Sequence, residues 1–282
     1  MNHRTKLASV TVVFHFPPDE LKRNLDSYAD NVDFLIVWDN TPASSANTNL
    51  PSIVKEYPNA IIIQDGVNHG LPKAYNYALQ MAIEHGCTHL MTMDQDSTFE
   101  NFKDYRQQIE FIDDSSVGIF TCPINNDIQV SGYRDTTVCQ SGSIYTMEML
   151  RKVGGFREDL FIGMVDAEMS LRVIEKGYKI YQIANCNLVQ RIGSGRNVKF
   201  LGKKINVSDY GPLRHYYESR NRFLLWYEFP YDSKPVHKWL FLFSRLKLMV
   251  KILFFEKEKL NKCKAIVSGT WHGLRNQTTP FK

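Results

Sequence analysis

The 282-residue sequence lacks the patterns of a disulfide-rich, zinc-binding or membrane-spanning protein. Its five cysteines are odd in number, scattered along the chain, and form no C-x-x-C pair. This usage argues against a disulfide framework or a zinc site and indicates a reducing compartment. No apolar run reaches the roughly 18 residues that a bilayer-spanning helix needs, and no signal-peptide pattern follows Met1. We therefore expect a cytoplasmic protein.

Glycine-rich phosphate loops are also missing. An NAD-dependent dehydrogenase needs G-x-G-x-x-G directly after its first strand. Here the first predicted strand, residues 8–16, runs into Pro17-Pro18-Asp19. The motifs and stacking platforms by which proteins read nucleic acid are absent as well, so we expect no nucleic-acid partner.

Charge is unevenly distributed along a chain whose net charge is only +4. Residues 230–282 hold 11 Lys and Arg but 3 Asp and Glu, whereas the remainder holds 23 against 27. A basic end on a mildly acidic body predicts that this end meets an anionic partner, such as phospholipid.

Strand and helix patterns alternate through the first third of the chain. Apolar, β-branched runs at 8–16, 34–38, 60–64 and 89–93 are separated by a helical pattern at 20–28, a polar loop, and a second helical pattern at 72–85. Such alternation predicts an α/β fold with a mostly parallel sheet and helices on its faces.

Polar side chains follow three of these predicted strands. Asp39 ends the second, Asn68 follows the third, and Asp94 and Asp96 end the fourth. In a parallel sheet these positions meet at the carboxyl edge, where ligands bind. Two carboxylates spaced i, i+2 suit a hard divalent cation that shares its ligands with phosphate. The alternative is an Asp-rich turn that caps the next helix.

A second pair of acids lies at the start of a predicted helix ending at Gly177. Asp166 is near the N-terminus of this helix and Glu168 is in its first turn. Acids favour such positions through the helix dipole alone. A carboxylate held there can also act as a general base.

At this point the chain resembles the inverting glycosyltransferases of family 2, which have the GT-A fold, and most closely their rhamnosyltransferase-like subgroup in bacterial surface-polysaccharide synthesis. The resemblance covers roughly residues 8–230 and rests on these segments in the family's order: Val37-Trp38-Asp39-Asn40, Asn68-His69-Gly70-Leu71-Pro72-Lys73, Met93-Asp94-Gln95-Asp96-Ser97, Gly154-Gly155-Phe156 with Phe161-Ile162, Val165-Asp166-Ala167-Glu168, and His215-Tyr216-Tyr217 with Arg220-Asn221.

The resemblance implies a nucleotide-sugar site. Asp39 would contact the base, Asn68 and Lys73 would lie beside the nucleotide pocket, and Asp94 would bind ribose or metal. Arg220 would clamp the diphosphate, because a guanidinium matches phosphate geometry.

It also implies a metal and a catalytic base. Asp96 would bind the Mg²⁺ or Mn²⁺ that bridges the diphosphate, and Asp166 takes the position of the base. His215 is a further metal or phosphate contact, or else a histidine packed beside two tyrosines.

The implied reaction moves a sugar from a nucleoside-diphosphate donor to a saccharide or lipid-linked saccharide. Rhamnose from dTDP-rhamnose is the favoured donor, and a UDP-hexose is the alternative. A sugar nucleotidyltransferase is the second alternative, although its usual Gly-rich loop is missing.

Two segments depart from the family pattern. The first strand usually ends in Thr-Tyr-Asn-Pro, but here it reads Phe14-His15-Phe16-Pro17. A His is usual before Ile-Gly, but Gln190-Arg191 precede Ile192-Gly193. His215 or Arg191 would then substitute for the missing ligand.

The C-terminal region, residues 231–282, is expected to be a helical appendage to a catalytic domain of residues 1–230. Within 236–256, Ser244, Lys247 and Lys251 share one helical face, and apolar side chains lie largely on another. Such a helix can lie on a membrane, here the inner face of the plasma membrane. The alternative is packing on the catalytic domain or on the second subunit of a homodimer.

Overall fold

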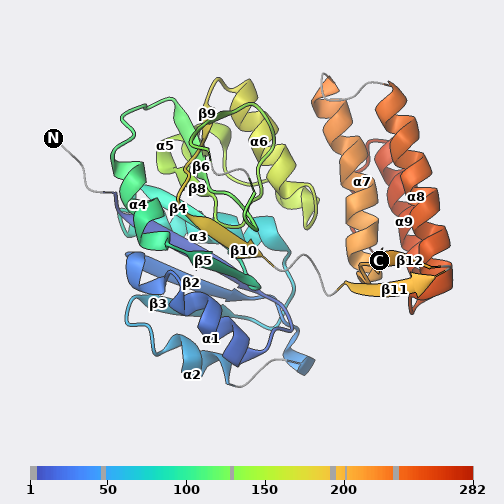
Figure 1. The fold of residues 1–282 in the computed structure, drawn as a ribbon, viewed down its shortest axis with the longest axis horizontal. Helices are drawn as coiled ribbons and strands as arrows, with labels where there is room; N and C mark the ends of the chain where they lie inside the picture. Colours follow the sequence, from blue (N-terminus) through green and yellow to red (C-terminus); the bar gives the residue numbers. More distant parts are fainter. Residues whose placement is uncertain are drawn as a thin grey trace. The chain divides into compact units, whose positions relative to one another are not determined.

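The computed structural model describes residues 5–45, 49–127, 130–190, 195–200, 202–230 and 235–281. The chain forms two compact units, which are described separately (Figure 1). Unit 1 contains Met1–Glu158 and Val165–Gln190, and unit 2 contains Asp159–Met164 and Arg191–Lys282. The two compact units divide after Gln190. The end of the catalytic domain at residue 230, expected from the sequence, is a different boundary and stays a prediction.

Unit 1 is built on an eight-stranded sheet with the order β3-β2-β1-β4-β8-β6-β9-β7. β1 runs parallel to β2 and β4, β2 to β3, and β6 to β9, while β8 and β7 are antiparallel to their neighbours. The predicted mostly parallel sheet is therefore confirmed. Its strands are β1 (Leu7–Val13), β2 (Phe34–Asp39), β3 (Ala60–Gln64), β4 (His89–Asp94), β6 (Val117–Thr121), β7 (Gly132–Arg134), β8 (Ile144–Thr146) and β9 (Lys179–Gln182).

Helices flank this sheet, and those expected from periodicity are present. α3 lies against β1, β2 and β4, and begins after Gly70, whose φ of 77° suits glycine. Pro72 lies in its first turn, as expected from the missing amide hydrogen of proline. The helices of unit 1 are α1 (Pro18–Asp26), α2 (Leu50–Val54), α3 (Leu71–Glu84), α4 (Phe102–Glu110), α5 (Met147–Val153) and α6 (Val165–Glu175).

A second, two-stranded sheet was not predicted. β5 (Ser97–Glu100) pairs antiparallel with β10 (Asn187–Gln190), so that Ser97 lies opposite Gln190. The strand β5 follows directly after Asp94-Gln95-Asp96. The pairing therefore brings a residue from far along the chain beside the two acids.

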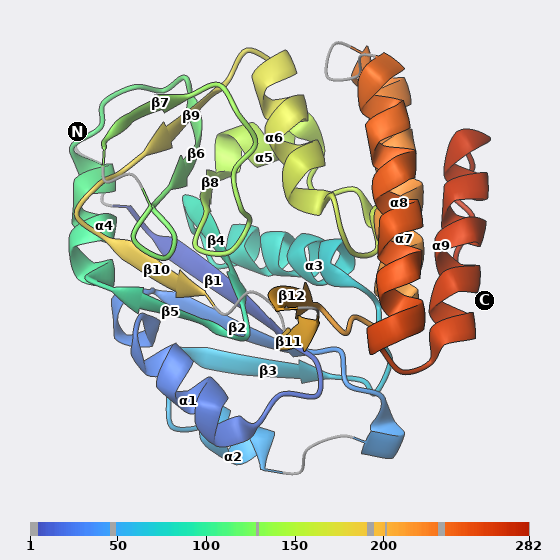
Figure 2. The same ribbon diagram turned by 45° about the vertical axis from the view of Figure 1, so that its right-hand side comes forward.

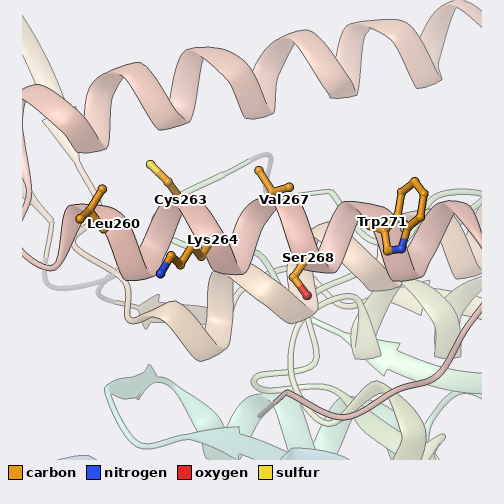
Figure 3. Close-up of a pocket in the computed structure, with 6 residues that line it drawn as sticks. All are labelled: Leu260, Cys263, Lys264, Val267, Ser268 and Trp271. Carbon is orange, nitrogen blue, oxygen red and sulfur yellow. The ribbon is translucent and has the colours of Figure 1, made fainter.

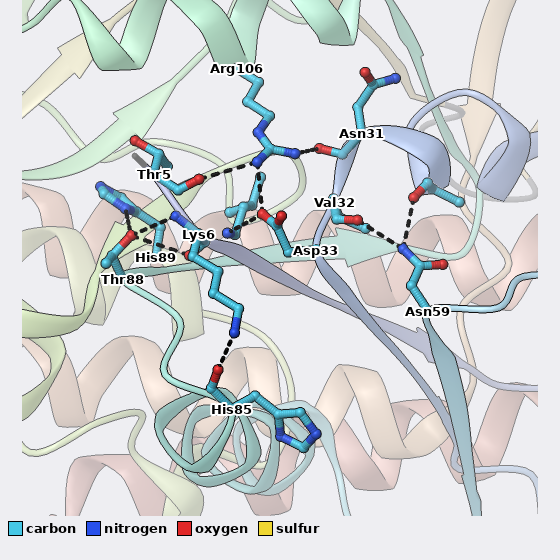
Figure 4. Close-up of polar contacts among 12 residues, drawn as sticks. Thr5, Lys6, Asn31, Val32, Asp33, Asn59, His85, Thr88, His89 and Arg106 are labelled. Carbon is cyan, nitrogen blue, oxygen red and sulfur yellow. Dashed lines mark hydrogen bonds and ion pairs between the residues drawn. The ribbon is translucent and has the colours of Figure 1, made fainter. Parts of the chain in front are cut away.

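The amino edge of the main sheet is held by a polar network around Arg106 of α4 (Figure 4). The guanidinium of Arg106 donates to the carbonyls of Thr5 and Asn31 and to Asp33 Oδ2, the last at 2.7 Å. Asp33 Oδ2 also accepts the backbone N–H of Leu7 at 2.8 Å. These bonds fix α4 to the starts of β1 and β2, on the edge opposite to the predicted site.

Unit 2 contains a hairpin and three long helices (Figure 2). The hairpin pairs β11 (Arg196–Phe200) with β12 (Lys203–Val207), and the helices are α7 (Pro212–Glu228), α8 (Pro235–Phe255) and α9 (Lys259–Leu274). The predicted C-terminal helical region is confirmed. Within the described ranges, no helix is both long enough and apolar enough to cross a bilayer.

Close packing of α9 on α7 depends on two glycines. A Cβ at Gly269 would lie 2.2 Å from the carbonyl oxygen of Tyr216, and one at Gly273 would lie 2.7 Å from that of Arg220. Both contacts are with backbone, which cannot move aside like a side chain. The inner face of α9 is thereby fixed against α7.

We predict a pH-dependent contribution of His89, the first residue of β4, to stability. Burial lowers the pKa of His89 to about 4, below the value of about 6.5 expected in the unfolded chain. As the pH falls below about 6.5, the unfolded state takes up this proton first, so the free energy of unfolding should fall. The loss should reach on the order of 3 kcal/mol near pH 4.

Urea denaturation of the wild type and His89→Gln between pH 7 and pH 4 measures this contribution. The glutamine does not titrate, so the variant should show a shallower pH dependence. Parallel curves for the two proteins would contradict the prediction.

Candidate functional site

The strand register places two of the predicted site residues at one edge of the sheet. Val13 of β1 pairs with Asp39 of β2, and Val12 pairs with Asp94 of β4. Both acids therefore flank the carboxyl end of β1, two strand spacings or roughly 10 Å apart. This is the edge at which open α/β sheets bind ligands.

The carboxylate of Asp94 is held by two side-chain amides. Gln190 Nε2 donates to Oδ2 at 2.7 Å, and Gln140 Nε2 lies 3.4 Å from Oδ1. The backbone N–H of Asp94 donates to Ser141 Oγ at 3.1 Å, and that hydroxyl in turn bonds to Ser97 Oγ at 2.8 Å. The orientation of Asp94 is thus set by β10 and by the loop before β8.

The thiol of Cys139 lies among three predicted site acids. Its pKa is raised to about 12, first by burial and then by the negative charges of Asp94, Asp166 and Asp96. The charges of all three acids thus act in the same direction on this thiol. The protonated thiol donates to Gln190 Oε1 at 3.7 Å, which turns the amide nitrogen of Gln190 toward Asp94.

The structure separates the roles of Asp166 and Glu168 at the start of α6. Glu168 is fully buried and pairs with Arg172 at 2.7 Å, and Arg172 also donates to the carbonyls of Val153 and Gly155. Glu168 is therefore structural. Asp166 is half-buried, and its charge contributes to the raised pKa values of Tyr75 and Cys139.

Asp39 is the last residue of β2, and Asn68 lies in the loop after β3. Asp39 is buried and accepts the N–H of Thr41 at 2.8 Å and Gln64 Nε2 at 2.7 Å. Asn68 Oδ1 accepts the N–H of Gly70 at 3.0 Å, just before α3. Lys73 is exposed in the first turn of that helix.

Asn40 joins these two loops and was not among the predicted site residues. Its side chain donates to the carbonyl of Gly70 at 3.0 Å and accepts the N–H of His69 at 3.0 Å. Its oxygen also accepts the indole N–H of Trp38 at 2.8 Å. The sequence could have identified Asn40, because it follows Trp38 and Asp39 in a segment that matches the family pattern.

Arg220 lies in unit 2 and is fully buried. Its five N–H groups are directed at Asn221 Oδ1 (twice) and at the carbonyls of Asp159, Thr278 and Thr279. The guanidinium thus binds the C-terminal segment and has no donor left for a diphosphate in this arrangement. The predicted role of Arg220 as a diphosphate clamp stays a prediction, and it would require some of these bonds to break.

His215 also lies in unit 2, only 1% exposed. Neither ring nitrogen has a hydrogen-bond partner among the described residues, and burial lowers its pKa. Tyr210 packs edge-on against the ring, at 6.3 Å between centroids. These surroundings match a packed histidine, and its role as a metal ligand stays a prediction. Arg191, the other substitute for the missing family His, lies outside the described residues.

The acids at the carboxyl edge could bind a cation together with a substrate, but with the other described residues they do not form a complete metal site made of protein ligands alone. Across the described ranges, no group of three His, Cys, Asp or Glu is placed to hold a metal. Asp94 and Asp96 are half-buried and supply oxygen atoms at the end of β4. Mg²⁺ is typically bound by one or two carboxylates, with phosphate oxygens and water completing its shell.

Alkylation of Cys139 provides a test of the carboxylate cluster. In a Cys263→Ser background, iodoacetamide at pH 8 should modify Cys139 on the order of 10³-fold more slowly than free cysteine, because its thiolate is scarce. Asp94→Asn and Asp166→Asn should each speed the reaction, since each removes a charge that raises the thiol pKa. Asp104→Asn on the exposed surface of α4 is the control, and equal rates in all variants would contradict the cluster.

The chain is similar to known glycosyltransferases. No known protein-family model matches it. It is 27% identical over 216 residues to dTDP-rhamnosyl transferase RfbF of Shigella flexneri, covering 68% of this chain and 70% of that protein.

Two solved structures share the fold. Mannosyltransferase PcManGT from Pyrobaculum calidifontis, in complex with GDP-Man and Mn²⁺, matches with a TM-score of 0.61 and 14% identity over 96% of this chain and 88% of that one. TarS of S. aureus in complex with UDP-GlcNAc matches with a TM-score of 0.54 and 16% identity over 96% and 81%. The GT-A fold predicted from the sequence is thus confirmed, as is the resemblance to rhamnosyltransferase-like enzymes.

Proposed function

We propose that this chain is a glycosyltransferase that moves a sugar from a nucleoside-diphosphate donor to a hydroxyl group of a saccharide or lipid-linked saccharide in surface-polysaccharide synthesis. The observation that carries this proposal is the pair of acids at the carboxyl edge of the sheet, Asp39 and Asp94, with Asp94 held by Gln190 and Gln140. A fold alone does not need acids at the ends of these strands, and this is the edge at which open α/β sheets bind ligands. A nucleotide-sugar donor would give these acids a use, because its base, ribose and metal-bound diphosphate all bind polar or charged groups.

The favoured donor is dTDP-rhamnose, because the Shigella flexneri relative is named for it and aligns along two thirds of this chain. A UDP-hexose is the alternative donor. A sugar nucleotidyltransferase is the alternative reaction, and it would release pyrophosphate in place of a nucleoside diphosphate.

In the proposed site, Asp39 contacts the nucleotide base, and Asn68 and Lys73 lie beside the nucleotide. Asp94 binds ribose or contributes to the metal site, with Gln190 and Gln140 fixing its orientation. Asp96 is the principal ligand of Mg²⁺ or Mn²⁺. When bound, this ion neutralises charge on the diphosphate.

Asp166 acts as the general base. Its carboxylate takes the proton of the acceptor hydroxyl while the hydroxyl oxygen bonds to the anomeric carbon of the sugar. The bond between that carbon and the diphosphate oxygen breaks, and the nucleoside diphosphate leaves with the electron pair. Attack from the face opposite the leaving group inverts the anomeric centre, so no covalent sugar-enzyme intermediate is needed.

Asp166→Asn should reduce transfer by about 10²-fold or more, because the amide cannot accept the proton. Donor binding and the thermal unfolding midpoint should be preserved, since asparagine has nearly the same size and Asp166 is only half-buried. Turnover is measured as nucleoside diphosphate released in the presence of acceptor. A variant with wild-type turnover would remove Asp166 from this role.

Asp96→Ala should weaken metal-dependent donor binding. Calorimetry with dTDP-rhamnose and Mn²⁺ should give a lower affinity for this variant than for the wild type and for Asp104→Ala, the exposed control on α4. A wild-type affinity that is equal with and without metal would count against the metal assignment.

A screen of nucleoside diphosphates and their sugars identifies the donor. Thermal unfolding should shift most with the thymidine nucleotide and its rhamnosyl derivative, and further with Mn²⁺ present. A larger shift with the uridine compounds would favour the UDP-hexose alternative.

A further inference from the structure

Helix α8 in unit 2 has two apolar stripes, only one of which is covered. Phe241 and Ile252 lie on the inner stripe, and Phe241 packs against Phe223 and Trp226 of α7 at 5.7 and 5.5 Å between ring centroids. Ile252 is fully buried. This stripe accounts for the packing of α8 within unit 2.

The outer stripe of α8 is exposed to solvent. It repeats at the three- and four-residue spacing of one helical face, and its exposed fractions run from 46% at Leu253 to 73% at Trp239. Its members are Trp239, Phe243, Leu246, Val250, Leu253 and Phe254. A row of large exposed apolar side chains is typical of an interaction surface.

Helix α9 also has exposed apolar side chains. Leu260, Val267 and Trp271 are 72%, 58% and 52% exposed, and they line a hollow of about 550 Å³ together with Cys263, Lys264 and Ser268 (Figure 3). The opposite face of α9 is fixed to α7 through Gly269 and Gly273. Among the described residues, these side chains of α9 therefore remain exposed.

Cations surround the exposed apolar side chains. Lys247 Nζ lies 5.0 Å from the ring centroid of Phe243, and the guanidinium of Arg275 lies 3.9 Å from that of Trp271. Residues 235–281 hold nine Lys and Arg but only two acids, Glu256 and Glu258. Glu256 is buried and pairs with Lys262 at 2.8 Å, so Glu258 is the one acid of this segment at the surface.

We propose that the outer face of α8 and α9 binds an anionic phospholipid surface. Aromatic and aliphatic side chains would enter the headgroup region, and the flanking lysines and arginine would meet lipid phosphates. Two copies of this face would bring like charges together, which disfavours a homodimer through it. Since neither helix is apolar enough to span the bilayer, the surface lies on the membrane.

The test is co-sedimentation of the full chain with vesicles of phosphatidylcholine alone or mixed with phosphatidylglycerol. The protein should bind the anionic vesicles, and added salt should weaken binding. The double variant Lys247→Glu, Lys264→Glu should bind at least roughly tenfold more weakly. The double variant Phe243→Ser, Trp271→Ser should also lose binding, because it removes apolar area.

Matched controls come from unit 1, on helix α4 and just after it. Lys103→Glu reverses an exposed charge there, and Phe111→Ser removes a side chain that is 84% exposed. Both should bind vesicles like the wild type. Circular dichroism checks that all variants are folded.

Equal binding by the test and control variants would overturn the proposal, as would equal binding to neutral and anionic vesicles. A dimer in analytical ultracentrifugation that the same test variants dissociate, without vesicle binding, would assign the face to a second copy. These assays contain no sugar donor or acceptor, so their result does not depend on the proposed function.

Discussion

The proposed site depends on placing carboxylates at the carboxyl edge of the sheet and holding them in a fixed orientation. Asp94 and Asp96 come from the end of β4 and Asp166 from the start of α6, and all three raise the pKa of the Cys139 thiol. Like charges repel one another, so the surrounding groups must offset the repulsion. The amides of Gln190 and Gln140 do so at Asp94 without adding a positive charge. A cation shared with the donor would then find net negative charge in the site.

Much of the first unit could be predicted because its information is local. β-branched runs, proline at a helix start and acids at strand ends each identify an element over a few residues, and the parallel register then brings Asp39 and Asp94 to one edge. Gln190 and Cys139 carry no such signal. Gln190 reaches Asp94 only because β10 pairs with β5, and residues 101–186 separate the two strands in the sequence. Antiparallel pairing at that distance has no local sequence pattern.

Arg220 shows a different limit, because its residue type is visible in the sequence and its partners are not. A guanidinium suits phosphate, but it equally suits a set of carbonyl oxygens. Here the carbonyls of Thr278 and Thr279 come from the C-terminal segment, and that of Asp159 comes from the segment before α6. Backbone acceptors are present at every residue, so the sequence cannot mark which of them an arginine will meet. The acceptors that Arg220 meets follow from burial, which is a tertiary property.

The same reasoning explains why helix α8 was only half understood from its sequence. The periodicity of its sequence shows that α8 is amphipathic, but it does not show which apolar stripe is buried against the rest of unit 2. Phe241 and Ile252 turn toward the unit, whereas Leu246, Val250 and Leu253 remain outside. The uncovered stripe lies in the segment that holds 11 of the 34 basic residues, while the rest of the chain has a net negative balance. Near an anionic surface such a charge distribution favours approach by the helices and disfavours approach by the acidic remainder. Charge would therefore set the orientation of the protein before any apolar side chain enters the lipid.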